Sequence, residues 1–175
     1  MSDLRIISLF PSSSDILLDL NLEKQLVAVS HECLDKNYYN DLPKVTSTCI
    51  NINVPQSEID SQVRDKLKKN EPIYQIDVNL INKLKPTHIL TQDVCDVCAV
   101  SSNTIEVTLK DTRCELPNNI EIISLNSKTF SGICNDVLLV GKIFNKKNEA
   151  NEMIYLAKKK WNSLKKSKNH KKLLM

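Results

Sequence analysis

Glycine is scarce in this chain, with two residues in 175. Soluble proteins average about 7% glycine. The two that are present, Gly132 and Gly141, cannot form the glycine-rich turns that hold dinucleotides or nucleoside triphosphates, which need the patterns GxGxxG or GxxxxGK[ST]. We therefore exclude enzymes that bind a nucleotide through such a loop, and we expect no nucleotide cofactor.

Long apolar runs are also missing. A secretory signal peptide contains about 7–15 apolar residues in a row, whereas the first apolar run, residues 6–10, is interrupted by Ser8 and ends before Pro11. No segment approaches the roughly 18 apolar residues of a transmembrane helix. These absences predict a cytoplasmic protein with no membrane span, whose six cysteines are free or functional rather than paired in disulfides.

The rest of the composition is typical of one soluble domain. Apolar residues make up 41% and charged residues 26% of the chain, which excludes collagen, coiled-coil and disordered proteins. A length of 175 residues fits one domain with its own core. Eleven lysines and two acidic residues lie between Lys142 and Lys172. Because few aromatic residues are interspersed among them, a solvated helix end is a better interpretation than a tail that binds nucleic acid.

The apolar pattern predicts an α/β fold. Short apolar runs, which are typical of buried strands, occur at residues 6–10, 26–29, 45–48, 88–91 and 120–125. Segments with helical patterns separate most of them and start near residues 12, 57 and 77. This alternation predicts a single Rossmann-like lobe, in which helices cover both faces of a parallel sheet. From residue 133 onward the apolar positions describe one long helix or two stacked helices.

Three polar motifs each follow a predicted strand. They occupy residues 11–15, 30–33 and 91–98. Ligands of open parallel sheets bind at the loops beyond the carboxyl ends of the strands. We therefore expect the three motifs to gather at one edge of the sheet and to form a binding site.

Cys95 and Cys98 form the most conspicuous chemical motif. Two thiols at this spacing can line a site as free thiols, hold a soft metal or form a redox disulfide. A closed zinc site takes four ligands, and only His31 and Cys33 are available as partners from another loop. The redox interpretation lacks the aromatic residue before Cys95 and the proline before Cys98 that are typical of thioredoxins.

His31, Glu32 and Cys33 place an imidazole, a carboxylate and a thiol at the end of one strand. Successive residues there point in different directions, so the three do not all face one ligand. His31 is a candidate metal ligand, and a histidine held by a backbone carbonyl is the alternative. A Cys–His hydrolase would also need an orienting third residue and an oxyanion site, which the nearness of His31 and Cys33 in sequence does not supply.

The segment Pro11-Ser12-Ser13-Ser14-Asp15 places hydroxyl groups at the start of a predicted helix. Free backbone N–H groups at such a start would suit an anionic or amide-bearing part of a ligand. Ordinary capping of the helix by Ser12 or Ser13 is the alternative.

Together these segments resemble the substrate-binding proteins of ABC transporters for cobalamin and iron siderophores, especially the cobalamin-binding branch. The resemblance extends from Arg5 to about Phe144 and rests on RIISLFPSSSDI (5–16), VAVSHEC (27–33), SEID (57–60) and LKPTHILTQDVCDVCAVS (84–101). It implies the helical-backbone (class III) fold, in which one long helix joins two α/β lobes and a corrinoid or metal chelate lies between them. In the first lobe the ligand would meet Pro11, Ser12, Ser13, Ser14, His31, Glu32, Cys33, Gln92, Asp93, Cys95 and Cys98.

Two features differ from that family. The chain stops where the connecting helix would reach the second lobe, so apolar positions near Trp161 and Leu164 would lack cover. Family members dock on their permease through an acidic residue, and the corresponding position holds Asn79, with Asp77 two residues earlier. This difference argues against docking on an ABC permease.

We therefore expect a truncated, non-enzymatic substrate-binding protein. An α/β lobe would occupy residues 1–130, an inter-lobe helix 131–168 and a disordered basic tail 169–175. The expected ligand is cobalamin or another corrinoid, or a ferric chelate, with Cys95, Cys98 and His31 as candidate metal ligands. The alternatives are a CxxC metal-binding or thiol redox module, and an interaction protein whose homodimer replaces the missing lobe.

Overall fold

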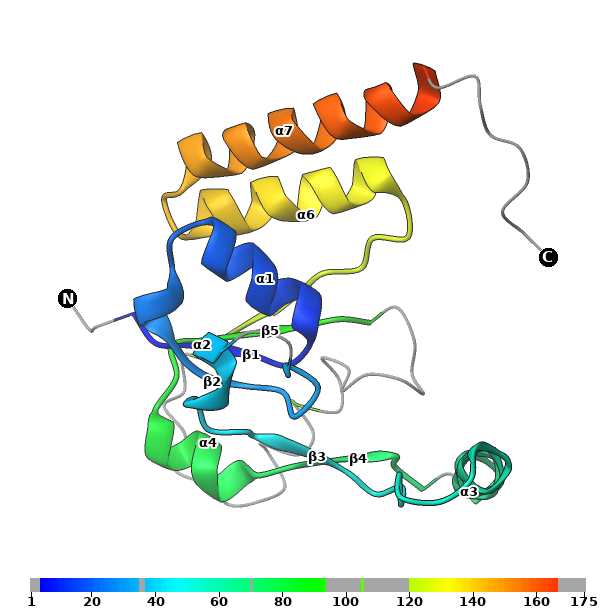
Figure 1. Ribbon diagram of the computed structural model, residues 1–175. Coiled ribbons are helices and arrows are strands. Elements are labelled where there is room, and N and C mark those ends of the chain that lie inside the picture. The colour runs from blue at the N-terminus through cyan, green and yellow to red at the C-terminus, as the bar shows by residue number, and fades with distance from the viewer. Residues whose placement is uncertain (1–3, 35–36, 70, 94–104, 106–119, 167–175) are drawn as a thin grey trace.

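The central element of the fold is a sheet of four parallel strands, in the order β2-β1-β5-β6. The computed structural model describes residues 4–34, 37–69, 71–93, 105 and 120–166. The strands are β1 (Ile6–Ser8), β2 (Leu26–Val29), β5 (His88–Thr91) and β6 (Glu121–Ser124). Helices flank both faces of this sheet (Figure 1), which confirms the predicted α/β class.

Both faces of the sheet are buried because neighbouring strand residues point to opposite sides. Ile6 and Leu90 belong to a core cluster shared with α1 (Pro11–Asp19) and α6 (Phe130–Ile143). Ile7 and Ile89 belong to a second cluster, shared with α4 (Val78–Leu84). A short 3₁₀ helix, Glu23–Gln25, precedes β2, and α2 (Asn37–Asn40) follows it.

The C-terminal segment forms two helices, which corrects the expectation of a single inter-lobe helix over 131–168 and agrees with the alternative of two stacked helices. After α6 the chain turns at Asn145, whose φ of 57° is left-handed, and continues as α7 (Lys147–Lys166). The two helices run side by side in opposite directions (Figure 1). Trp161 stacks on Phe130 with ring centroids 4.7 Å apart, whereas Leu164 stays 58% exposed. Every described helix is too short or too polar to cross a membrane.

A second, two-stranded sheet corrects one expectation from the sequence. β3 (Thr46–Thr48) pairs in antiparallel fashion with β4 (Tyr74–Ile76), a strand that the pattern did not predict. The segment 45–48 therefore does not extend the parallel sheet, apart from the single bridge between Val29 and Lys44. We call β3, β4 and the helix between them, α3 (Gln56–Lys68), the arm.

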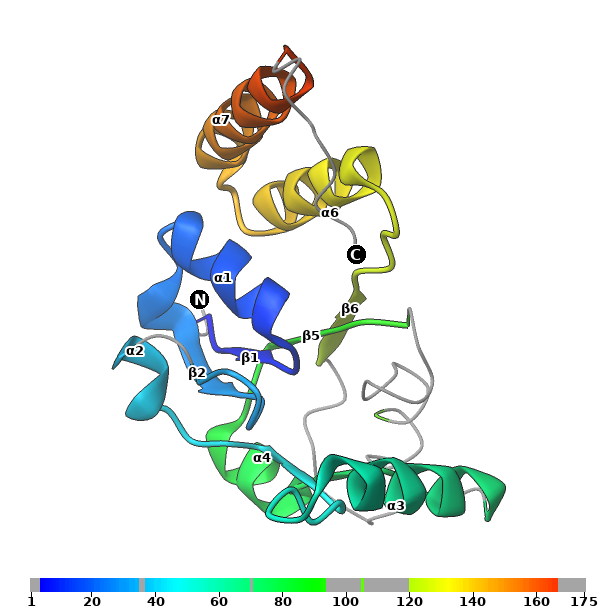
Figure 2. The same ribbon diagram turned by 45° about the vertical axis from the view of Figure 1, so that its right-hand side comes forward.

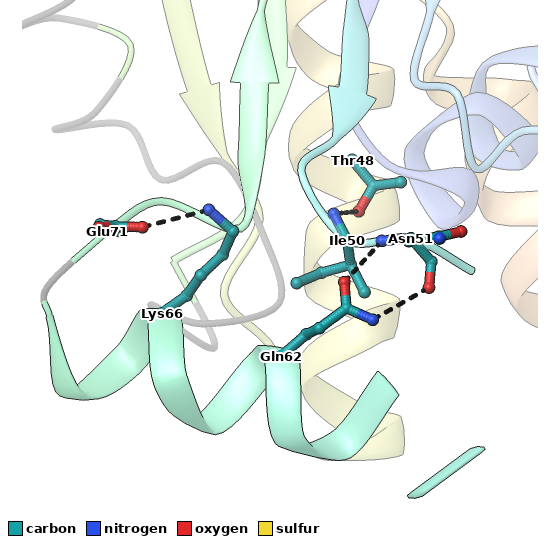
Figure 3. A network of polar contacts seen from close by, with 6 residues as sticks. All are labelled: Thr48, Ile50, Asn51, Gln62, Lys66 and Glu71. Atoms are coloured by element: carbon teal, nitrogen blue, oxygen red, sulfur yellow. Dashed lines mark hydrogen bonds and ion pairs between the residues drawn. The ribbon is translucent and has the colours of Figure 1, made fainter. Parts of the chain in front are cut away.

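Polar contacts join the helix of the arm to the segments of chain on either side of it. α3 lies at the outer end of the arm, apart from the four-stranded sheet (Figure 2), and none of its residues is buried. The amide of Gln62 accepts from Asn51 N–H (2.9 Å) and donates to the Asn51 carbonyl (3.3 Å). Figure 3 also shows Lys66 paired with Glu71 at 3.3 Å, near the end of the helix.

Candidate functional site

The polar motifs start at neighbouring strand ends. Ser30 N–H donates to the carbonyl of Ser8 (2.9 Å), so the ends of β2 and β1 lie together. Leu9 N–H donates to the carbonyl of Leu90 (2.9 Å), which joins the ends of β1 and β5. The structure therefore places the starts of all three motifs at one edge of the sheet.

The serine-rich segment divides into exposed and buried residues. Helix α1 begins at Pro11, and Pro11 and Ser12 are exposed in its first turn. Ser13 and Ser14 are fully buried, and the Ser13 hydroxyl donates to the Phe10 carbonyl (2.9 Å). Phe10 is the N-cap residue and contributes no side-chain cap, so the expected capping by Ser12 or Ser13 is wrong.

Cys33 belongs to the same buried group. Its Sγ atom lies 3.3 Å from the Ser14 hydroxyl, and its side chain is 1% exposed. Burial raises the pKa of the thiol, and its hydrogen bond with Ser14 opposes this only in part. Ser13, Ser14 and Cys33 thus lie behind the surface, where they support the loops, and their predicted contact with a ligand stays a prediction.

His31 is half-buried and held by Thr46. The Thr46 hydroxyl accepts from His31 N–H (3.0 Å), and the Nδ1 atom of His31 lies 2.7 Å from the same oxygen. Burial lowers the pKa of His31, with the negative charge of Glu32 opposing this change and the positive charge of Lys44 adding to it. The partner of the imidazole is therefore a side-chain hydroxyl, not the backbone carbonyl that we considered as the alternative.

Glu32 points to the arm. The Tyr74 hydroxyl donates to Glu32 Oε1 (3.0 Å), and the Tyr74 ring lies 5.4 Å from the His31 ring, centroid to centroid. Glu32 is exposed while Cys33 is buried. His31 and Glu32 thus both lie against Tyr74, whereas the Cys33 side chain is buried away from them, and the base of the arm adjoins the site.

The third strand end carries an exposed carboxylate. Asp93 N–H donates to Asn126 Oδ1 (2.7 Å), and the Ser124 hydroxyl donates to Asp93 Oδ2 (2.5 Å). Ser124 also lies 2.9 Å from Asn126 Oδ1. Gln92 beside them is half-buried. These contacts fix the Asp93 carboxylate at the ends of β5 and β6.

Four residues of the site were not singled out from the sequence: Thr46, Tyr74, Ser124 and Asn126. The alternation of apolar and polar residues over 74–77 could have indicated the strand that carries Tyr74. Ser124 and Asn126 lie at the end of a predicted strand, so the same strand-end rule would have found them. Thr46 stands at the start of its strand, where the sequence holds no comparable signal.

The predicted metal ligands are only partly covered by the structure. Cys95 and Cys98 lie outside the described residues. Within the described ranges, no group of three His, Cys, Asp or Glu side chains could hold a metal ion. Of the expected ligands, His31 is therefore the one whose surroundings are defined.

A separate groove of ≈ 770 Å³ lies between α7 and the end of α1. Its lining includes Asp19, Asn21, Glu152, Leu156 and Lys160. Asp19 is the last residue of α1, whereas the serine-rich segment forms its first turn. The groove therefore lies away from the site at the strand ends.

The family model for periplasmic binding proteins matches residues 6–173. The chain belongs to the periplasmic binding protein family. Among curated proteins, none matches the chain. This is a family of substrate-binding proteins, which confirms the expected class.

Solved structures of this family share the fold at low sequence identity. The haem-binding protein HutB of Vibrio cholerae is 19% identical, with a TM-score of 0.65 over 97% of this chain and 52% of its own. The vitamin B12-binding protein BtuF of Vibrio cholerae is 17% identical, with a TM-score of 0.61 over 91% of this chain and 49% of its own. IsdE of S. aureus, solved with haem, is 19% identical, with a TM-score of 0.59 and coverages of 97% and 52%.

Two consequences follow from these comparisons. The chain spans about half the length of the solved proteins that it matches. The expectation of a cytoplasmic protein is wrong, because the matching family and the matching HutB and BtuF structures are of periplasmic binding proteins.

Proposed function

We propose that this protein is a substrate-binding protein that binds a corrinoid or an iron chelate at the strand-end site, with His31 contacting the metal. The observation that carries the proposal is the position of His31. Its half-buried imidazole is held through Nδ1 at the end of β2, beside the loops that follow β1 and β5. An imidazole fixed on one nitrogen is a suitable axial ligand for a chelated metal through the other.

Polar groups for the periphery of a chelate surround His31. The exposed first turn of α1 begins at Pro11, which has no N–H, and there Ser12 offers its backbone N–H to anionic or amide side arms. Glu32 and Asp93 are exposed carboxylates whose positions are fixed by hydrogen bonds. Cys95 and Cys98 remain predicted contacts to the same ligand. The haem and B12 ligands of the solved neighbours support this class of cargo.

Docking on an ABC permease is a separate proposal, since the chain covers only half of its neighbours. The resemblance places the docking residue in α4, where the chain has exposed Asn79. The carboxylate of Asp77 accepts from Leu80 N–H (2.9 Å) and caps the helix. We propose that α4 is a weak docking surface, because it offers no free carboxylate at the expected position.

Titration of the protein with haemin, hydroxocobalamin and cobinamide, followed by absorption spectroscopy, tests the binding proposal. We expect a saturable spectral shift with at least one of these, and its loss in H31A. The matched control is H88Q, because His88 begins β5 at the opposite edge of the sheet. The proposal is wrong if none of the three chelates gives a saturable change at high micromolar concentration, or if H31A and H88Q bind like the wild type.

A further inference from the structure

The hydroxyl of Thr46 is fully engaged in hydrogen bonds. It donates its one proton to Ser30 Oγ at 3.1 Å. It accepts from the backbone N–H of His31 at 3.0 Å, and the Nδ1 atom of His31 lies 2.7 Å away. A hydroxyl group has one proton to donate and two lone pairs to accept with. Since the proton is used on Ser30, Nδ1 can bond to Thr46 only as a donor.

From this proton count we infer that Thr46 sets the tautomer of His31, with the proton on Nδ1 and a free lone pair on Nε2. An unperturbed neutral histidine prefers the opposite arrangement, with its proton on Nε2. Thr46 is therefore a positioning residue, which acts on a ligand only through His31. The inference rests on the proposed function for its biological use, since a lone pair on Nε2 is what a chelated metal requires.

Ser30 also belongs to the set of hydrogen bonds that orients His31. Its side chain is buried, and its Oγ also accepts from Glu32 N–H at 3.2 Å. Ser30 thereby keeps the Thr46 proton turned away from the imidazole. Without Ser30, the Thr46 hydroxyl would be free to donate to Nδ1, and the proton of the imidazole would move to Nε2. Substitutions of Thr46 and of Ser30 should therefore have the same effect on the tautomer of His31.

The first test uses the protein without any ligand. Long-range ¹H–¹⁵N NMR spectra distinguish the two tautomers of a neutral histidine by the shifts of Nδ1 and Nε2. We expect His31 to be protonated on Nδ1 in the wild type and to shift toward Nε2–H in T46V and S30A. T46S, which keeps the hydroxyl, should restore the wild-type pattern. The matched control is T48V, because Thr48 lies in the same strand and bonds Ile50 N–H instead.

The second test uses the same variants in a titration with whichever of haemin, hydroxocobalamin or cobinamide the wild type binds. Loss of an outer partner of a ligating histidine typically weakens metal binding by about 10–100-fold. We expect this loss for T46V, with T46S and T48V close to the wild type.

The outcomes separate the two proposals. A wild-type His31 protonated on Nε2, or a tautomer unchanged in T46V, overturns the inference, and the wild-type spectrum decides this even where T46V does not fold. An Nδ1–H tautomer in a protein that binds none of the three chelates supports the role of Thr46 and overturns the proposed function. If His31 is protonated on Nδ1 in the wild type but T46V binds the chelate as tightly as the wild type does, the use of this tautomer in ligation is overturned.

Discussion

The Sγ atom of Cys33 lies 3.3 Å from the Oγ atom of Ser14, at one end of a buried chain of hydrogen bonds. From Ser14 the chain continues to Ser8 (2.7 Å), from Ser8 to Ser13 (2.5 Å), and from Ser13 to the Phe10 carbonyl (2.9 Å). If each group donates to the next, every proton has an acceptor. This chain joins the ends of β1 and β2 to the first turn of α1, and so it holds the loops around His31.

Removing the middle of this chain should destabilise the protein. In S8A, the Ser13 hydroxyl keeps only its bond to the Phe10 carbonyl, and the Ser14 hydroxyl keeps Cys33 and a long contact of 3.4 Å to Phe10. Loss of the short bonds to Ser8 in this buried group should cost about 1–3 kcal/mol in the free energy of unfolding. Urea unfolding measures this loss. S12A is the control, since Ser12 is exposed and its loss should change stability by no more than about 0.5 kcal/mol. Equal stabilities of S8A and S12A would show that the chain is not stabilising.

His88 should make the protein less stable in mild acid. Burial lowers the pKa of His88, and Glu121 opposes this only in part. The folded protein therefore resists a proton that the unfolded chain takes up near pH 6.5, the ordinary value for histidine. Below that pH the unfolded state binds more protons, so the free energy of unfolding decreases as the pH falls.

The variant H88Q tests this dependence, because glutamine does not titrate. The stability of H88Q relative to the wild type should rise between about pH 7.5 and pH 5.5, whatever its value at neutral pH. Chemical unfolding at several pH values measures the two slopes. Parallel slopes would contradict a lowered pKa for His88.

The parallel sheet could be predicted because its strands are short apolar runs buried on both faces. Ile6 and Ile7 illustrate this, since they belong to the two opposite core clusters. The pairing of β3 with β4 could not be predicted in the same way. Its two strands are separated by α3, and antiparallel pairing across such a distance depends on tertiary contacts that no local pattern records.

The place of His31 after a strand was enough to predict that it belongs to the site. The roles of the residues around it could not be predicted in this way. His31 follows a predicted strand, and residues that follow parallel strands lie at the edge of the sheet where ligands bind. Ser13 and Ser14 were expected to face a ligand because their hydroxyl groups lie at the start of a helix that follows a predicted strand. In the structure they are buried, because hydroxyl groups that satisfy one another can lie inside the protein. The contact of Thr46 with His31 depends on the fold of the segment between them, since the two residues are 15 positions apart.

Helix α3 should open more readily than the rest of the protein. None of its residues is buried, whereas α6 buries Cys134, Val137 and Val140. Elements with few buried contacts open locally at low free energy. Hydrogen exchange followed by mass spectrometry should therefore show faster exchange in residues 56–68 than in residues 130–143. Equal protection of the two helices would contradict this view of the arm.

The two hydrogen bonds between Gln62 and Asn51 should set the opening rate of α3. We expect Q62A to accelerate exchange in α3 and to leave the exchange of α6 unchanged. K66A is the matched control on the same helix, because its exposed pair with Glu71 is worth only about 0–1 kcal/mol. Similar exchange in Q62A and K66A would show that the Gln62 contacts do not hold the helix.

Gly141 sets how closely α6 and α7 approach each other. A Cβ atom at position 141 would lie 2.6 Å from the Cβ of Ala150 and 3.0 Å from the carbonyl oxygen of Lys146. Alanine is the better helix former by about 1 kcal/mol, yet G141A should destabilise the protein, since overpacking costs about 1–3 kcal/mol. The second substitution A150G removes the methyl group that causes the closer clash. In a double-mutant cycle, G141A/A150G should therefore be more stable than the sum of the single effects predicts. Urea unfolding of the four proteins measures this coupling, and strictly additive effects would show that the two helices move apart to admit the methyl group.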